Sequence, residues 1–127
     1  MKYIFTSLIS LFMAFSASAF EKQPFSEALF SELQTQNAVI MIDVYAPWCP
    51  TCKKQQKLFQ QYHEQNPDKP FHVLVVDYDN DKQWVKKFRT PRQSTLLLYK
   101  GDKQFWYSVA ETRFNVIEEK LNSAFKF

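Results

Sequence analysis

The stretch VIMIDVYAPWCPTCK, residues 39–53, holds both cysteines of the chain and the residues directly before them. Its first seven residues are apolar apart from Asp43, a pattern typical of a central strand that is buried on both faces. A helix is expected to begin at Cys49, because Pro50 suits the first helical turn, where no helical N–H is required. Cys52 follows three residues later and so lies on the same helical face. The stretch therefore predicts a strand, a short loop and a helix whose N-terminus carries two neighbouring thiols.

Segments typical of helices and of strands alternate along the rest of the chain. The predicted strands are Val39–Tyr45, Phe71–Asp77, Thr95–Tyr99 and Lys103–Val109, and the predicted helices are Pro24–Gln34, Cys49–Gln65, Asn80–Phe88 and Thr112–Phe125. Strand–helix alternation gives parallel neighbours, whereas a two-residue hairpin at Gly101 and Asp102 adds an antiparallel pair. We therefore expect an α/β fold, a three-layer α/β/α sandwich with a mixed, mainly four-stranded sheet.

The composition fits one packed domain. The chain has 127 residues, of which 46% are hydrophobic and 23% are charged, so a core is available and disorder is not expected. Gly101 is the only glycine, which argues against a glycine-rich phosphate loop. The formal net charge of +3 is mild and gives no reason to expect a nucleic-acid partner. We expect a monomer.

Residues 1–19 have the pattern of an export signal. Lys2 supplies the positive start, an apolar segment follows, and Ala17 to Ala19 form a small-residue cleavage site. The apolar segment is short for a membrane span, which needs about 20 residues. We therefore predict a signal peptide at 1–19, a domain at 20–127 and a periplasmic or secreted location. The alternative is an uncleaved membrane anchor.

The spacing of the two cysteines favours redox chemistry over a structural disulfide. Disulfides form in exported proteins, but a bond between Cys49 and Cys52 closes so short a loop that it removes little chain entropy. The partial positive charge of a helix N-terminus stabilises a thiolate there. We therefore expect Cys49 to be an acidic, exposed nucleophile and Cys52 to be a more buried thiol that attacks a mixed disulfide.

Two segments of the chain resemble the thioredoxin superfamily. DVYAPWCPTCK, residues 43–53, is similar to the active-site segment of that family, and STLLLYKGDK, residues 94–103, is similar to the segment that enters its hairpin. The resemblance implies a thiol:disulfide oxidoreductase with a redox-active disulfide between Cys49 and Cys52 and no cofactor. Its partners would be cysteine-containing exported proteins, or a membrane thiol–disulfide electron donor or acceptor.

The resemblance also assigns roles to Asp43 and Trp48. Asp43 matches a buried aspartate of the family, which would accept the proton of Cys52 through a water molecule when Cys52 attacks. Burial would raise the pKa of this carboxyl group. The alternative is an ordinary strand-end aspartate bonded to the backbone or to a lysine. Trp48 matches a tryptophan beside the nucleophile that contacts substrate, and its alternative is ordinary core packing.

Three positions depart from the family pattern. A lysine that often accompanies the buried aspartate would align near Val75, so that charge is missing there. Thr51 is neutral at a position where strongly oxidising members often carry histidine, which favours reduction or isomerisation over strong oxidation. Ser94 stands where the family has a cis-proline facing the cysteines.

The replacement of that proline leads to expectations about the substrate groove. A cis bond before a non-proline residue costs about 3–4 kcal/mol, so we predict a trans Gln93–Ser94 bond. Ser94 would then bring an N–H and a hydroxyl close to Cys49, and Gln93 would line the substrate groove. We expect Ser94→Pro to leave the fold intact while altering mixed-disulfide lifetime or metal uptake. Pro91 lies three residues too early to take the proline's place.

Other candidates are weaker. The alternative function is a thioredoxin-fold module that holds a metal ion or a client thiol without turnover, with Cu(I) suited to two thiolates. His63 and His72 could join the cysteines in a zinc site, but one lies in a helix and the other opens a strand, so no metal site is predicted. A basic cluster, which we interpret as a solvated surface, consists of Lys86, Lys87, Arg89 and Arg92.

Overall fold

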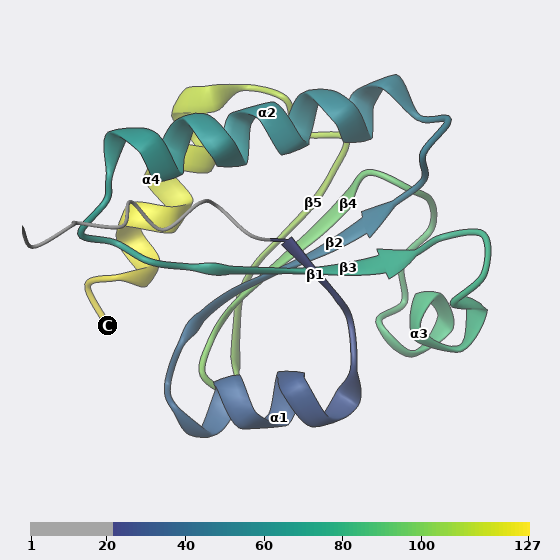
Figure 1. Ribbon diagram of the computed structural model, residues 1–127, viewed down its shortest axis with the longest axis horizontal. Helices are drawn as coiled ribbons and strands as arrows, with labels where there is room; N and C mark the ends of the chain where they lie inside the picture. The colour runs from purple at the N-terminus through teal and green to yellow at the C-terminus, as the bar shows by residue number, and fades with distance from the viewer. Residues whose placement is uncertain (1–21) are drawn as a thin grey trace, which may run out of the picture.

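A computed structural model of the chain describes residues 22–127 (Figure 1). The predicted signal peptide at 1–19 lies outside the described residues. In chain order the elements are β1 (Lys22–Pro24), α1 (Glu27–Thr35), β2 (Val39–Tyr45), α2 (Pro50–Gln65), β3 (His72–Asp77), α3 (Lys82–Lys87), β4 (Thr95–Lys100), β5 (Lys103–Val109) and α4 (Phe114–Ala124). Within residues 22–127, no helix combines the length and the apolar composition that crossing a membrane requires.

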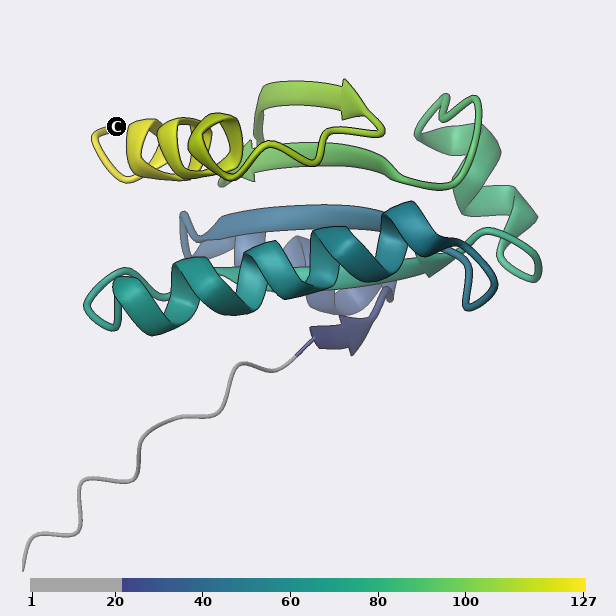
Figure 2. The same cartoon turned by 90° about the horizontal axis from the view of Figure 1, so that it is seen from above.

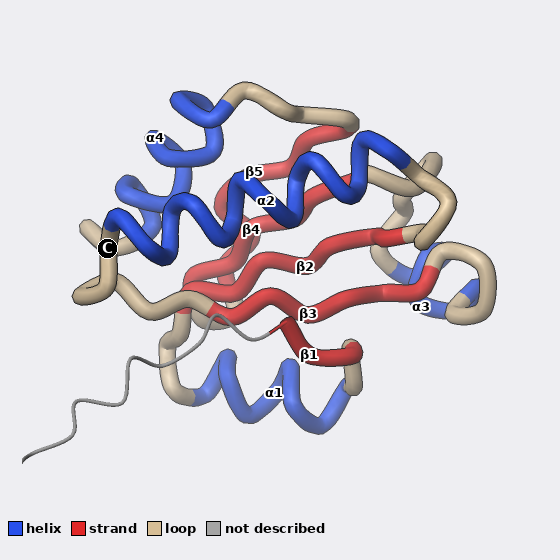
Figure 3. Tube along the Cα trace, turned by 45° about the horizontal axis from the view of Figure 1, so that its top comes forward, coloured by secondary structure: helices blue, strands red, loops and turns tan. Residues whose placement is uncertain are grey.

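The strands form one mixed sheet in the order β1-β3-β2-β4-β5, as Figure 3 shows. β3 pairs in parallel with both β1 and β2, whereas β4 pairs antiparallel with β2 and with β5. The hairpin between β4 and β5 turns at Gly101, whose φ of 57° suits glycine. A Cβ atom at Gly101 would lie 2.7 Å from Oδ1 of Asn37, the end of a side chain that can move aside, so the positive φ is the main reason for glycine at this turn.

Helices cover both faces of the sheet, which confirms the predicted three-layer sandwich. α2 and α4 lie side by side on one face, and α1 and α3 lie on the other (Figures 1 and 2). Alternate residues of β2 face the two layers: Met41 packs with Phe59 of α2, and Ile42 packs in the cluster under α1. The same alternation places Asp43 on the α2 face.

Lys22–Pro24 is a fifth strand that the sequence did not indicate. A helix was predicted from Pro24, but β1 occupies that position and pairs with Val73 to Val75 of β3. The helix starts after Ser26, whose hydroxyl accepts a hydrogen bond from the Leu29 N–H at 3.1 Å. All three β1 residues are exposed, so this edge strand carries no alternating apolar pattern that would reveal it.

Candidate active site

The two cysteines lie at the N-terminus of α2, directly after the loop that leaves β2. Cys49 is the N-cap residue, and its sulfur accepts a hydrogen bond from the Cys52 N–H at 3.2 Å. Pro50 occupies the first turn, as predicted. Both thiols are free in this structure. The first turn of the helix thus points the Cys52 N–H at the Cys49 sulfur, which favours the negative form of that sulfur.

Cys49 is buried, so the prediction of an exposed nucleophile is wrong. Its residue exposure is 2%, against 0% for Cys52, because Ala46 and the partly buried Tyr45 and Tyr78 pack around the pair. Burial raises the pKa of the Cys49 thiol, but hydrogen bonds from Cys52 and Ser94 outweigh it and hold that pKa below its usual range. Burial raises the pKa of the Cys52 thiol. The environments therefore separate the two thiols in acidity, in the predicted direction.

Ser94 lies between the two sulfur atoms. Its Oγ is 3.2 Å from the Cys49 Sγ and 3.2 Å from the Cys52 Sγ. Every peptide bond in residues 22–127 is trans, which confirms the predicted trans Gln93–Ser94 bond. The Ser94 N–H does not face a thiol, however, because it donates to the Val44 carbonyl at 2.8 Å. Only the hydroxyl of Ser94 therefore serves the cysteine pair.

Gln93 and Pro91 flank this serine differently. Gln93 is half-buried, and its side chain makes the smallest of the contributions that lower the pKa of the Cys49 thiol. Pro91 is exposed and follows a trans bond, so it does not take the place of a cis-proline packed on the cysteines.

Asp43 is completely buried beneath α2. Gln56 donates a hydrogen bond to Asp43 Oδ2, and Oδ1 has no partner among the residues that the structure describes. Burial raises the pKa of Asp43 to about 7, although the Gln56 hydrogen bond and the charge of Lys22 oppose this rise. A carboxyl group with this pKa can exchange a proton near neutral pH.

Lys22 places a positive charge near Asp43. The sequence had suggested that no such charge would be present, because Val75 stands where the family lysine was expected. Val75 is the β3 partner of Asp43 in the register, at the place where the family lysine was expected. The cation that acts on Asp43 comes instead from β1, where the Lys22 ammonium lies 5.0 Å from the centroid of the Tyr45 ring. Neither Lys22 nor Gln56 was recognised from the sequence, since only the fold brings them close to Asp43.

Trp48 lies at the surface beside Cys49. The side chain is 57% exposed, so the alternative of ordinary core packing is wrong. Its indole N–H donates to Asp79 Oδ2 at 2.8 Å, and the backbone N–H of Asp79 donates to Asp77 Oδ1 at 2.9 Å. The turn after β3 therefore holds the orientation of an exposed aromatic ring next to the thiols.

The two weaker candidates were a metal site and a basic cluster. Among the described residues, no three His, Cys, Asp or Glu side chains gather as a metal ion would require. The four residues of the basic cluster are exposed, and Lys87 forms a surface ion pair with Glu27 at 3.2 Å. These positions fit the interpretation of a solvated surface.

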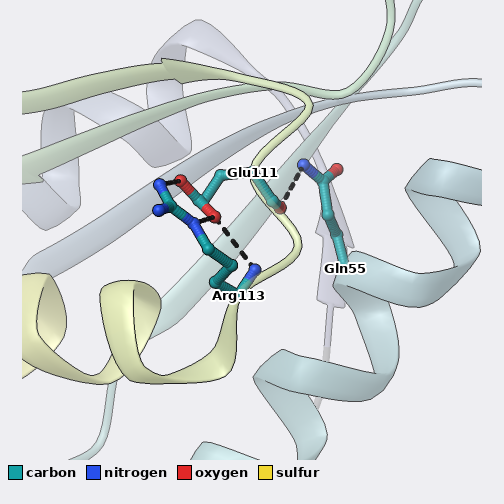
Figure 4. A network of polar contacts seen from close by, with 3 residues as sticks. All are labelled: Gln55, Glu111 and Arg113. Atoms are coloured by element: carbon teal, nitrogen blue, oxygen red, sulfur yellow. Dashed lines mark hydrogen bonds and ion pairs between the residues drawn. The ribbon is translucent and has the colours of Figure 1, made fainter.

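Gln55 is a buried residue of the site that sequence reasoning missed. Its Nε2 donates to the carbonyl oxygens of Ser94 and Glu111, each at 3.1 Å, and the latter bond is drawn in Figure 4. Its spacing of three residues from Cys52 on a helix was the available signal, because that spacing places both side chains on one face.

Comparisons with known proteins agree with this geometry. The Thioredoxin family matches residues 19–123. Thioredoxin-1 of Saccharomyces cerevisiae is 32% identical over 75 residues, which cover 59% of this chain and 71% of the yeast protein. The thiol:disulfide interchange protein DsbE of Escherichia coli K12 is 29% identical over 76 residues, which cover 57% of this chain and 38% of that protein.

A solved structure extends the similarity to most of the fold. The crystal structure of Trxlp from Edwardsiella tarda EIB202 superposes with a TM-score of 0.73 at 33% identity, covering 80% of this chain and 98% of that one. The family match, the shared fold and the paired thiols together show that the chain belongs to the thioredoxin family and is a thiol–disulfide oxidoreductase.

Proposed function

We propose that this chain is an exported oxidoreductase that exchanges disulfides with the cysteines of other exported proteins. The observation that carries the proposal is the asymmetry of the thiol pair. The Cys49 sulfur caps α2 and accepts the Cys52 N–H, and its pKa is lowered, whereas the pKa of Cys52 is raised. One thiol is therefore suited to attack and the other to wait in its protonated form.

The exchange proceeds in two displacements. The Cys49 thiolate attacks one sulfur of a substrate disulfide, forms a mixed disulfide and releases the other substrate sulfur as a thiolate. Cys52 then loses its proton and attacks the Cys49 sulfur of the mixed disulfide. This second step releases the reduced substrate and leaves a disulfide between Cys49 and Cys52. The reverse sequence oxidises a substrate dithiol.

Asp43 accepts the proton of Cys52 in the second step. Its pKa of about 7 suits a group that gains and loses a proton near neutral pH, and its Oδ1 is free of protein partners among the described residues. A water molecule on Oδ1 would connect the carboxylate to the thiol. On the surface, Trp48 and Gln93 line the groove for the substrate chain next to Cys49.

Electron flow in the cell runs toward reduction or isomerisation of substrates in this proposal. Neutral Thr51 supplies no additional positive charge to the thiolate. A membrane thiol–disulfide donor would then return the pair to its dithiol form. In this proposal the protein acts in the periplasm or outside the cell after cleavage of residues 1–19. N-terminal sequencing of the mature chain, isolated from its native compartment, tests the cleavage.

Turnover with a disulfide-bonded protein tests the enzyme reaction. Insulin reduction with dithiothreitol as the electron source should accelerate in the presence of the wild-type chain, and Cys49→Ser should abolish the acceleration. Oxidation of a dithiol peptide by the disulfide form measures the reverse direction. Absence of both activities in folded wild-type protein would overturn the proposed reaction.

A further inference from the structure

Gln55 is a fully buried polar side chain whose bonds reach out of its own helix. Burying an amide is unfavourable unless its polar atoms are paired, and its Nε2 pairs with two backbone carbonyls. Its Oε1 has no partner among the described residues. The amide therefore links α2 to the loop before β4 and to the loop after β5.

The first carbonyl belongs to Ser94, which has an unusual backbone. Its φ is 66°, a left-handed conformation that is unfavourable for a residue with a Cβ. The Ser94 carbonyl accepts from Gln55 Nε2 at 3.1 Å and from the Ala110 N–H at 2.9 Å, and the Ser94 N–H donates to Val44. These bonds hold the serine in a conformation that it would otherwise leave.

The second carbonyl belongs to Glu111, which is itself held in place. The Nε and Nη2 atoms of Arg113 donate to the two carboxylate oxygens of Glu111, both at 2.9 Å, and the Arg113 backbone N–H adds a third bond (Figure 4). These bonds are local to the loop between β5 and α4. Gln55 therefore connects the Ser94 carbonyl to the backbone of this loop at Glu111.

We propose that Gln55 is a positioning residue for thiol–disulfide exchange: by holding the Ser94 carbonyl, it keeps the Ser94 hydroxyl between the two sulfur atoms. A hydroxyl group has one hydrogen and two acceptor positions. The Ser94 Oγ lies 3.2 Å from each sulfur, so the proposal assigns its hydrogen to the Cys49 thiolate and leaves its lone pairs to face the Cys52 thiol. This inference rests on the proposed role of Cys49 as the attacking thiolate.

The test compares Gln55→Leu with Gln60→Leu. Gln60 lies on the same helix, but its amide binds Glu64 at the surface, so the control removes an amide without touching Ser94. The readout is the ultraviolet absorbance of the Cys49 thiolate during a pH titration, with its alkylation rate at a fixed low pH. We expect Gln55→Leu to slow alkylation of Cys49 by about three- to tenfold. The hydrogen bond from the Ser94 hydroxyl to the Cys49 thiolate would weaken, so a smaller fraction of Cys49 would be ionised at that pH. Gln60→Leu should match wild type.

A double variant separates positioning from general loosening of the fold. If Gln55 acts through the serine hydroxyl, Gln55→Leu should have no further effect on the titration when Ser94→Ala is already present. The proposal would be overturned if Gln55→Leu shifted the Cys49 titration equally in the presence and in the absence of the Ser94 hydroxyl. It would also be overturned if Cys49 titrated in Gln55→Leu as it does in wild type. If Gln55→Leu does not fold, Gln55→Met, which keeps the length of the side chain, takes its place under the same criteria.

The titration needs no substrate, so it distinguishes this inference from the proposed function. Absence of both insulin reduction and dithiol oxidation in the folded wild-type chain would overturn the exchange reaction, whatever the Gln55 result. A wild-type chain that reduces insulin while Gln55→Leu titrates normally would overturn only the positioning role.

Discussion

At the scale of single residues, Ser94 explains why the site differs from a proline-containing one. Proline is restricted to a φ near −65° and has no N–H, whereas Ser94 has a φ of 66° and donates its N–H to Val44. The expectation that Ser94→Pro leaves the fold intact therefore needs revision. Side-chain chemistry was readable from the sequence, but the backbone conformation that excludes proline was not.

Ser94→Pro should destabilise the fold by roughly 2–3 kcal/mol, because its backbone conformation is incompatible with proline. Ser94→Gly is the matched control, since glycine adopts a positive φ readily, and its stability should stay within about 1 kcal/mol of wild type. Urea unfolding of the three proteins measures both values. A Ser94→Pro chain as stable as wild type would contradict the described backbone at this position.

Asp43 should make stability fall as pH rises. Its folded pKa of about 7 lies above the unfolded value of about 3.9, so between these values the folded state holds a proton that the unfolded state has lost. The stabilising effect of the protonated group is complete below about pH 4 and is lost as pH rises through 7. Asp43→Asn should remove this loss and raise the unfolding free energy at pH 8 by about 2–4 kcal/mol.

Urea unfolding of wild type and Asp43→Asn between pH 4 and pH 8 checks this dependence. The gain from the substitution should shrink toward the acid end of the series. A gain that is the same at every pH would show that charge burial at Asp43 is not its cause.

At the scale of elements, β1 matters because it carries a charge to the core aspartate. Lys22 opposes the rise of the Asp43 pKa, so Lys22→Met should raise that pKa further. Nuclear magnetic resonance of the Asp43 carboxyl carbon follows the titration directly. Lys57→Met on α2 provides a control that removes a lysine outside the groups acting on Asp43. An unchanged Asp43 titration in Lys22→Met would remove β1 from the electrostatics of the site.

The accuracy of the sequence predictions differed between elements for physical reasons. β2 was predicted with its observed bounds, because a buried strand needs an apolar run that is visible in one sequence. β1 was missed, because an exposed three-residue edge strand depends on backbone pairing with β3. α3 is shorter than predicted, since Asn80 belongs to a turn in which Asp77 accepts its N–H.

The same distinction applies to the site. Cys49, Cys52, Asp43 and the Ser94 hydroxyl were identified from one strand–helix motif and one family resemblance. Gln56 reaches Asp43 through the packing of α2 on the sheet, and Lys22 through the pairing of β1 with β3. The burial of Cys49 comes from Ala46, Tyr45 and Tyr78, which pack around the pair. Contacts that arise from packing and strand pairing have no signature in local spacing.

At the scale of the whole molecule, the buried and asymmetric thiol pair sets the redox character. Thr51 is neutral and places no positive charge beside the Cys49 thiolate. The reduced, dithiol form of this chain is therefore stabilised less than the reduced form of a strongly oxidising member. We expect a reduction potential clearly more negative than about −120 mV, the value of a strongly oxidising member. Equilibration with glutathione measures it. A potential at or above that value would reverse the proposed direction of electron flow.

The central claim is that Cys49 attacks and Cys52 resolves, and trapping of the mixed disulfide tests it most directly. Each single variant is incubated with a disulfide-bonded protein substrate, and the linked cysteine is identified by mass spectrometry. Cys52→Ser should accumulate a mixed disulfide through Cys49, because the thiol that resolves it is gone, whereas Cys49→Ser should accumulate none. A mixed disulfide that forms through Cys52 in Cys49→Ser, with none in Cys52→Ser, would contradict the assignment.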